Sequence, residues 1–377
     1  MNQKFLLLVL KYFCFSMAEM LLKASRMLSA LLFVSNLLPW VHGEPQVPCY
    51  FIFGDSLFDN GNNNLLLNLA KANYLPYGID FPKGPTGRYS NGRNIGDAIA
   101  ELLGFEGYIP SLKQAIVANN VLQGVNYASG GAGIRNETGR QVGDLVPMDE
   151  QLQNHRTIVS RITRILGSKD SAFKHLNKCI YTVDMGINDY IMNYFMPQFY
   201  YTSRQYNVEQ YATALIQQYS EQLKSLYDAG ARKIAVMGLV RGGCFPFSLA
   251  TFGTNGSLCV EMINNAVQIF NNKLISLINN LNAHLPHARF TYINLFQIDG
   301  ASAQGFNITN IGCCRVITFV PCIPFSSPCS NRTDHQYAYW DSVHPIEARA
   351  LIIGRRAYEA QEPTDAFPFD IRRLAQL

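Results

Sequence analysis

The sequence alternates short apolar runs with longer amphipathic segments. Five apolar runs have the length and composition of buried strands, and they cover residues 49–53, 123–128, 179–185, 233–239 and 289–295. Apolar residues at helical spacing predict helices at 94–103, 151–166, 208–229, 258–283 and 345–360, with Pro345 in the first turn of the last one. Strands that alternate with helices form parallel sheets covered on both faces. The sequence therefore predicts an α/β protein with a central parallel sheet of about five strands.

The composition is that of an ordinary globular protein. Hydrophobic residues make up 48% of the chain and charged residues 15%, which is enough for a substantial core. There is no internal repeat, low-complexity tract or linker, so we expect residues 44–377 to form a single domain. The formal net charge is +4, and four of the basic residues fall in the first 43 residues. The chain after residue 43 is therefore close to neutral, which argues against nucleic acid as a partner.

Residues 1–43 are typical of a secretory signal peptide. Lys23 and Arg26 precede an apolar run at 28–38, and small residues follow, which predicts cleavage after Gly43. A second apolar block near the N-terminus leaves the start codon open. The competing interpretation is a membrane anchor, but the apolar run is shorter than a bilayer requires. We therefore expect a secreted, extracellular protein whose mature chain has no stable membrane span.

The cysteines agree with an oxidising compartment. Eight follow the predicted leader: Cys49, Cys179, Cys244, Cys259, Cys313, Cys314, Cys322 and Cys329. An even set in a secreted protein predicts disulfides, with the connectivity open. A zinc site at the last four is less favoured because their spacing is not a paired Cys-x-x-Cys. Cys49 and Cys179 begin apolar runs, so free, buried thiols are the alternative there. Four glycosylation sequons fit secretion: Asn136, Asn255, Asn307 and Asn331.

Polar or glycine-rich turns follow three of the predicted strands. Ser56 comes after the first, Gly130 and Gly131 after the second, and Asn188 after the third. Because the carboxyl ends of parallel strands meet at one edge of a sheet, we expect these groups to lie close together. A hydroxyl, an exposed backbone N–H and a side-chain amide are the parts of a serine nucleophile with an oxyanion hole. By itself, however, Gly-Asp-Ser is also ordinary turn composition.

The best candidate for a general base is His344. It follows Asp341 by three residues in a loop before the last predicted helix, so the carboxylate can hold Nδ1 and leave Nε2 free for a hydroxyl. The other histidines after the leader have settings more typical of surface or structural residues: His155, His175, His284, His287 and His335.

Four sequence blocks together resemble the GDSL esterase/lipases, the plant-type branch of the SGNH hydrolases. The blocks are Phe53-Gly54-Asp55-Ser56-Leu57, Gly-Val-Asn-Tyr-Ala-Ser-Gly-Gly-Ala-Gly-Ile from Gly124, Gly186-x-Asn188-Asp189 and Asp341-x-x-His344-Pro345. They occur in order and cover essentially the whole mature chain. The absence of a Gly-x-Ser-x-Gly elbow around Ser56 separates the sequence from the α/β-hydrolase fold.

The resemblance implies a fold, a reaction and roles for individual residues. The implied fold is a three-layer, flavodoxin-like α/β/α fold of the SGNH hydrolases, and the implied reaction is ester hydrolysis without a metal or organic cofactor. Ser56 is the implied nucleophile, His344 its base and Asp341 the residue that orients the base. The Ser56 N–H, the Gly131 N–H and the Asn188 side chain are the implied oxyanion hole, with Gly131 preferred to Gly130 for its spacing from Asn126.

The substrate is less constrained than the reaction. The apolar stretch 316–325 forms either a lip for acyl chains or a loop that merely packs, and we expect Phe319 to distinguish the two. Lipid esters and carbohydrate acetyl esters both remain open. Two other functions use the same fold: an acyltransferase that passes the acyl group to an alcohol, and a catalytically silent binding protein. The intact Ser56, Asn188, Asp341 and His344 argue against the silent protein.

Overall fold

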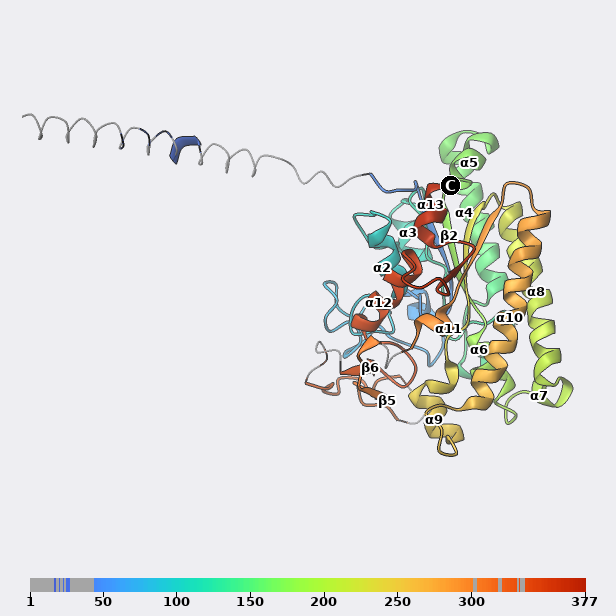
Figure 1. The fold of residues 1–377 in the computed structure, drawn as a ribbon. Helices are drawn as coiled ribbons and strands as arrows, with labels where there is room; N and C mark the ends of the chain where they lie inside the picture. Colours follow the sequence, from blue (N-terminus) through green and yellow to red (C-terminus); the bar gives the residue numbers. More distant parts are fainter. Residues whose placement is uncertain are drawn as a thin grey trace, which may run out of the picture. The chain divides into compact units, whose positions relative to one another are not determined.

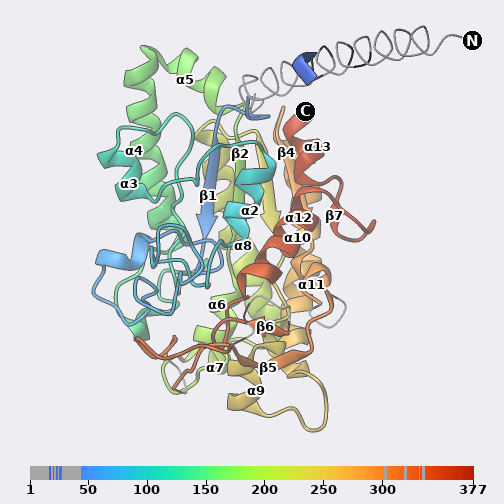
Figure 2. The ribbon, with the colours of Figure 1, turned by 90° about the vertical axis from the view of Figure 1, so that its left-hand side faces the viewer.

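A five-stranded, mostly parallel sheet forms the centre of the fold (Figures 1 and 2). The strands, in spatial order, are β1 (Tyr50–Gly54), β2 (Ile180–Asp184), β3 (Lys233–Met237), β4 (Arg289–Ile293) and β7 (Ala366–Phe367). The first four are parallel, and β7 pairs antiparallel with β4. The predicted α/β fold with a central sheet of about five strands is confirmed, although its last strand is a short antiparallel one from the C-terminal region.

The computed structural model describes residues 17, 20, 23, 25–27, 44–300, 304–317, 321–330, 332 and 336–377. The chain divides into a unit that ends at Glu44 and a second unit, Pro45–Leu377, which contains every element discussed here. The predicted signal peptide at 1–43 lies almost entirely outside the described residues and stays a prediction. No described helix is both long and apolar enough to cross a membrane.

The segment predicted as the second strand, 123–128, lies beside β1 but is not a regular strand. The Tyr50 N–H donates to the Gln123 carbonyl at 3.0 Å, and the Tyr127 N–H donates to the Ile52 carbonyl at 2.8 Å. Only Asn126 forms a parallel bridge to β1. Gly124 interrupts the regular strand with a φ of +118°. With this segment counted second, the parallel strands lie in the flavodoxin order 2-1-3-4-5.

Helices cover both faces of the sheet, as Figure 1 shows. One layer contains α4 (Met148–Leu166), α8 (Val208–Asp228) and α10 (Glu261–His284), and the other contains α2 (Ile95–Leu102), α12 (Glu347–Tyr358) and α13 (Ile371–Gln376). The five predicted helices are therefore present. Shorter elements connect them: α3 (Leu112–Val117), α5 (Lys169–Leu176), α6 (Ile187–Asp189), α7 (Thr202–Gln205), α9 (Pro246–Phe252), α11 (Leu295–Ile298), η1 (Asn62–Leu65), η2 (Arg140–Val142), η3 (Tyr190–Tyr194), η4 (Gly242–Cys244) and the paired strands β5 (Ile308–Gly312) and β6 (Tyr337–Tyr339).

The first turn of α12 differs from the prediction. The helix begins at Glu347 with Ile346 as its N-cap, so Pro345 lies just before it. Pro345 instead forms an antiparallel bridge with Tyr339, at the end of β6. The loop that carries His344 is therefore fixed to extended backbone on one side and to a helix on the other.

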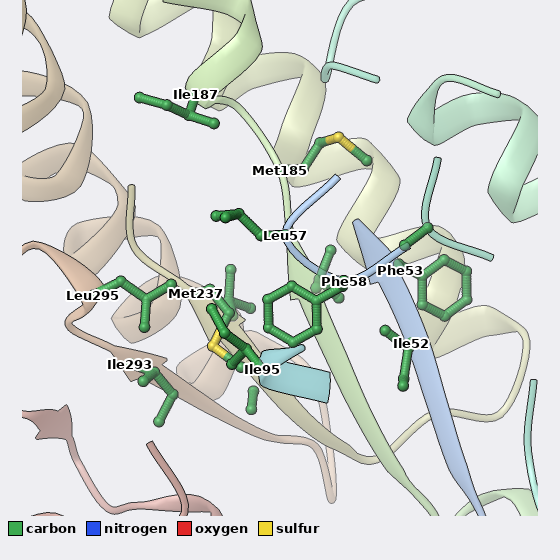
Figure 3. Close-up of a cluster of buried hydrophobic side chains, with 14 of the residues drawn as sticks. Ile52, Phe53, Leu57, Phe58, Ile95, Met185, Ile187, Met237, Ile293 and Leu295 are labelled. Atoms are coloured by element: carbon green, nitrogen blue, oxygen red, sulfur yellow. The ribbon is translucent and has the colours of Figure 1, made fainter. Parts of the chain in front are cut away.

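Apolar residues next to Ser56 and Asn188 in the sequence anchor the turns that follow β1 and β2 (Figure 3). Leu57 and Phe58 follow Ser56, and Met185 and Ile187 precede Asn188. All four are buried in the core together with side chains from the strands. Their burial removes apolar surface from water, so each turn is held against the sheet by its neighbours in the sequence.

Four disulfides are present in the described part of the chain. They join Cys49 to Cys179, Cys244 to Cys259, Cys313 to Cys329 and Cys314 to Cys322. The prediction of disulfides is confirmed, and the alternative of free Cys49 and Cys179 is wrong because their positions just before two paired strands, β1 and β2, bring them together.

We expect Gly124→Ala to destabilise the protein by about 3 kcal/mol or more. A Cβ at this position would lie 1.9 Å from the Tyr50 carbonyl oxygen, on backbone that side chains rarely adopt. Urea unfolding measures the change. Gly84→Ala is the matched control, because Gly84 also has a positive φ of +68° but nothing within 4 Å of the added atom. Equal losses in both variants would contradict the steric argument.

Candidate active site

The candidate residues meet at the carboxyl-terminal edge of the sheet. A cavity of about 520 Å³ opens there, and its wall includes Ser56, Gly131, Asn188, Asp341 and His344. This volume is within the usual range for small-molecule sites. The turns after β1, after the 123–128 segment and after β2 thus supply the first three groups, and the loop before α12 supplies the last two.

A chain of hydrogen bonds links Ser56, His344 and Asp341. His344 Nε2 lies 2.7 Å from Ser56 Oγ, and His344 Nδ1 lies 2.7 Å from Asp341 Oδ2. The two side chains of the loop are buried, whereas Ser56 is partly exposed to the cavity. A hydroxyl, an imidazole and a carboxylate in this order can activate the hydroxyl oxygen as a nucleophile.

The loop from 341 to 344 is folded by its own carboxylate. Asp341 Oδ1 accepts the backbone N–H of both Val343 and His344 at 2.8 Å. The Trp340 N–H donates to the His344 carbonyl at 2.7 Å, which closes the loop. The ring of Tyr89 packs against the His344 ring with centroids 4.7 Å apart. The imidazole is therefore held in one orientation by the loop and by an aromatic neighbour.

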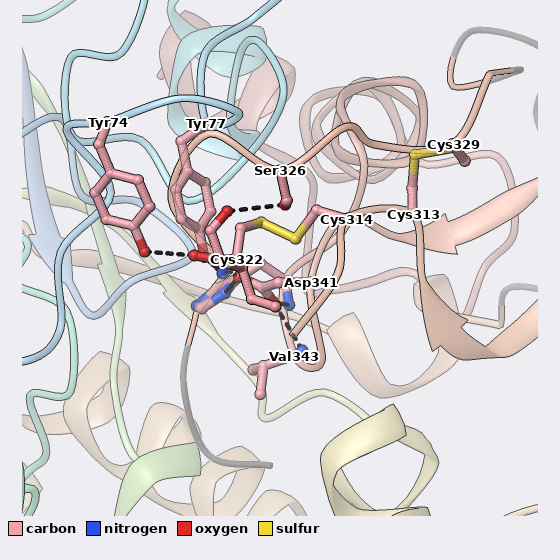
Figure 4. Close-up of a disulfide and its surroundings, with 11 residues drawn as sticks. Tyr74, Tyr77, Cys313, Cys314, Cys322, Ser326, Cys329, Asp341 and Val343 are labelled. Atoms are coloured by element: carbon pink, nitrogen blue, oxygen red, sulfur yellow. Dashed lines mark hydrogen bonds and ion pairs between the residues drawn. A yellow bond between two sulfur atoms is a disulfide. The ribbon is translucent and has the colours of Figure 1, made fainter. Parts of the chain in front are cut away.

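Tyr77 adds a fourth member to this hydrogen-bond chain. Its hydroxyl donates to Asp341 Oδ2 at 2.6 Å and accepts the Cys322 N–H at 3.1 Å (Figure 4). Burial alone would raise the pKa of Asp341, but the charge of His344 and the hydrogen bonds from His344 and Tyr77 outweigh it and lower the pKa below its usual value. The loop closed by the Cys314–Cys322 disulfide is thus connected to the carboxylate.

Two backbone N–H groups on the cavity wall are available as donors. Among the described residues, neither the Ser56 N–H nor the Gly131 N–H has a hydrogen-bond acceptor. The Gly130 N–H, in contrast, donates to Asp59 Oδ2 at 3.0 Å. Of the two glycines, only Gly131 therefore has an N–H that is free to donate into the cavity, and its role in an oxyanion hole stays a prediction.

Asn188 reaches the cavity wall with its amide held by two acceptors. Its Nδ2 donates to Asp55 Oδ2 at 3.1 Å and to the Ala132 carbonyl at 3.0 Å. Asp55 also accepts the Leu57 N–H at 2.9 Å, and burial raises the pKa of this carboxyl to about 7. Asp55 lies next to Ser56 in the turn after β1. It thus orients the side-chain amide of Asn188, which lies in the turn after β2.

Sequence reasoning missed the residues that support the glycine turn. Asp59 accepts the N–H groups of Gly61, Asn62 and Gly130, and Asn63 donates to the Gly130 carbonyl at 2.8 Å. Both side chains are buried. The signal in the sequence was the run of Asp, Asn and Gly at 59–64. Such a run is too polar to be buried unless each polar group has a hydrogen-bond partner. For Tyr77 the sequence contained no such signal.

The rest of the cavity wall is mostly apolar. Its apolar side chains are Leu69, Ala70, Val142, Ile191, Met192, Met196, Phe199, Phe247, Pro321 and Val343. From the predicted lip at 316–325, Pro321 contributes to the wall, whereas residues 318–320, including Phe319, lie outside the described part. The cavity can therefore accommodate an apolar group beside the Ser56 hydroxyl.

The other candidate residues lie away from the cavity. His155 is buried against Tyr127, where burial lowers the pKa of its ring to about 3. Within the described ranges, the one group of close metal-ligating side chains is Cys49, His175 and Cys179, and its two thiols are joined in a disulfide. The sequon residues Asn136, Asn255 and Asn307 are exposed, and Asn331 and His335 lie outside the described residues.

The fold and this arrangement of groups define an enzyme of the hydrolase class, and comparisons with known proteins identify its family. The model of the GDSL-like lipase/acylhydrolase family matches residues 50–357. GDSL esterase/lipase At1g29670 of Arabidopsis thaliana is 52% identical over 342 residues, covering 89% of this chain and 93% of the relative. GDSL esterase/lipase At5g45670 of the same plant is 47% identical over 363 residues, covering 94% and 99%. The chain belongs to the GDSL-like lipase/acylhydrolase family, which makes it an ester hydrolase.

Proposed function

We propose that this protein is a secreted serine hydrolase that cleaves carboxylic esters through an acyl-enzyme on Ser56. The observation that supports this proposal best is the hydrogen-bond chain from Ser56 through His344 to Asp341, with 2.7 Å at each step, beside an apolar cavity. One hydroxyl and one imidazole suffice for acyl transfer.

In the first half of the reaction, His344 Nε2 accepts the Ser56 proton while Oγ attacks the ester carbonyl carbon. The electron pair of the carbonyl double bond moves to oxygen, and the N–H groups of Ser56 and Gly131 stabilise the negative charge. Asn188 supplies a third donor when one of its two amide hydrogens is shared between the oxyanion and its acceptor, Asp55 Oδ2 or the Ala132 carbonyl. Collapse of the intermediate breaks the bond to the alcohol, which leaves with the proton from His344.

The second half returns the enzyme to its starting state. His344 accepts a proton from water, whose oxygen attacks the acyl carbonyl on Ser56. Collapse then releases the carboxylic acid, and Ser56 Oγ recovers its proton from His344. Asp341 holds Nδ1 throughout and stabilises the imidazolium that forms in each half. An alcohol in place of water would give acyl transfer, so product analysis with and without added alcohol separates the two reactions.

The cavity wall supports an acyl group longer than acetyl. Ile191, Met192 and Met196 line the cavity from the turn and π-helix that follow Asn188, and Val142 lines it beside Gly131. Burying a chain of methylene groups among such side chains stabilises the bound ester by about 0.8 kcal/mol per group. An acetyl group would leave most of this apolar wall in contact with water.

Secretion is supported by the covalent structure. Four disulfides join cysteines of the described chain, and disulfides form and persist in oxidising compartments. Three sequon asparagines are exposed, so the folded protein has room for a glycan on each of them. Together with the apolar leader predicted at 1–43, these features support an activity outside the cytosol.

A fluorophosphonate probe tests the nucleophile without knowledge of the substrate. We expect the purified protein to be labelled, and we expect Ser56→Ala and His344→Ala to abolish the labelling. Ser342→Ala is the matched control, because Ser342 also lines the cavity but is not hydrogen-bonded to His344. Labelling that persists in Ser56→Ala, or that disappears in Ser342→Ala, would contradict the assignment.

Tyr77→Phe should change how activity depends on pH. A hydrogen bond to a charged group contributes about 1.5–3 kcal/mol, so its loss raises the pKa of Asp341. Protonated Asp341 no longer accepts from His344, and the acid limb of the kcat/KM profile should therefore move to higher pH. Hydrolysis of p-nitrophenyl butyrate across the pH range measures this shift.

Tyr74→Phe is the control for Tyr77→Phe. The Tyr74 hydroxyl binds the same loop, donating to the Cys322 carbonyl at 2.8 Å, but it does not touch Asp341 (Figure 4). We expect this variant to keep the pH profile of the parent. If both variants shift the profile equally, the effect comes from loosening the disulfide loop and not from the hydrogen bond to the carboxylate.

A further inference from the structure

An ordered segment beside the cavity turns leucine side chains toward solvent. Residues 65–69 alternate between exposed and half-buried, with Leu65, Leu67 and Leu69 exposed by 67%, 85% and 74%. We call these three side chains the leucine ridge. Leu65 ends the 3-10 helix η1 and bends follow it, so the three leucines are exposed on a short, irregular segment.

Hydrogen bonds hold the ridge in place, so its exposure is part of the folded structure. The Leu69 N–H donates to the Val142 carbonyl at 2.8 Å, and the Asp144 N–H donates to the Leu67 carbonyl at 3.0 Å. Lys71 Nζ donates to the Asn63 carbonyl at 2.6 Å, which closes the loop at its base. Single exposed leucines are common, but three within five residues of a fixed segment indicate an interaction surface.

The ridge is continuous with the mouth of the cavity. Leu69 belongs to the ridge and also lines the cavity. Phe199 lines the cavity as well and is 59% exposed, so it adds apolar surface at the opening. In Figure 2 the blue loops that follow β1 lie at the end of the sheet toward which β1 points, which is the edge that carries the site. Whatever binds the ridge therefore lies next to the entrance of the site.

The charge of the segment indicates the kind of partner. Residues 60–70 contain no charged side chain, and the polar ones among them are asparagines. An anionic membrane is recognised by clusters of Lys and Arg, which this segment lacks. A neutral apolar surface requires only that leucines lose contact with water.

We propose that the leucine ridge binds the surface of an aggregated neutral ester, such as an emulsion droplet, and so brings the cavity mouth to its substrate. This inference rests on the proposed ester hydrolysis at Ser56 and adds the physical form of the substrate. Leu65 and Leu67 enter the droplet surface, and a single ester molecule passes Leu69 into the cavity without crossing water.

Binding is tested apart from hydrolysis by flotation with droplets of trioctanoylglycerol. The parent is Ser56→Ala, which leaves the droplets intact, and the test variant adds Leu65→Ser and Leu67→Ser. We expect the ratio of bound to free protein to fall about tenfold or more. Val117→Ser in the same parent is the control, because Val117 is 77% exposed on α3 but does not line the cavity. It should bind like the parent.

An activity assay separates this proposal from the assignment of Ser56. With Ser56 intact, Leu65→Ser/Leu67→Ser should hydrolyse dissolved p-nitrophenyl butyrate at the wild-type rate and emulsified ester about tenfold more slowly. Equal flotation of parent and double variant would overturn the proposal even if Ser56 is the nucleophile. A wild-type dimer that the double variant converts to a monomer would also overturn it, since a second copy would then cover the ridge.

Discussion

The parallel pairing of β1 with β2 is the constraint on which the site depends. It sets Gly54 beside Asp184, so the turns that carry Ser56 and Asn188 leave the sheet side by side. Gly54 is suited to this contact, because a Cβ there would lie 3.0 Å from the Asp184 carbonyl oxygen. Once the strands are in register, Asp55 binds the Asn188 amide, and the two turns form one wall of the cavity.

Buried carboxyl groups hold the turns at the carboxyl-terminal edge of the sheet in place. Their raised pKa values show that burial makes the charged form of these groups less favourable. Burial raises the pKa of Asp55 to about 7 and the pKa values of Asp59 and Asp189 to about 6. Each accepts hydrogen bonds from backbone N–H groups of the loops around the cavity. Asp341 differs, because its partners lower its pKa and keep it charged beside His344. Such locally unfavourable groups are typical of functional sites, where positioning matters more than stability.

Much of the fold could be predicted, because buried strands and amphipathic helices have distinct periodicities. The regular-strand prediction at 123–128 was wrong because Gly124 packs against Tyr50 in a conformation that leaves the strand geometry. Ser56 and Asn188 could be predicted as site residues because parallel strands deliver their following turns to one edge, and His344 because Asp341 precedes it by three residues. The disulfide pairing and the role of Tyr77 depend on contacts between distant segments, which no local pattern encodes.

The central claim is that the turns after adjacent strands form one site for an acyl group and its oxyanion. The most direct test is a crystal structure of the protein after reaction with an alkyl fluorophosphonate. We predict a phosphonyl group on Ser56 Oγ, with one oxygen within about 3.2 Å of the Ser56 and Gly131 nitrogens and of Asn188 Nδ2. The alkyl chain should lie beside Met192 and Met196. An adduct on another residue, or a phosphonyl oxygen turned away from both backbone N–H groups, would contradict the account.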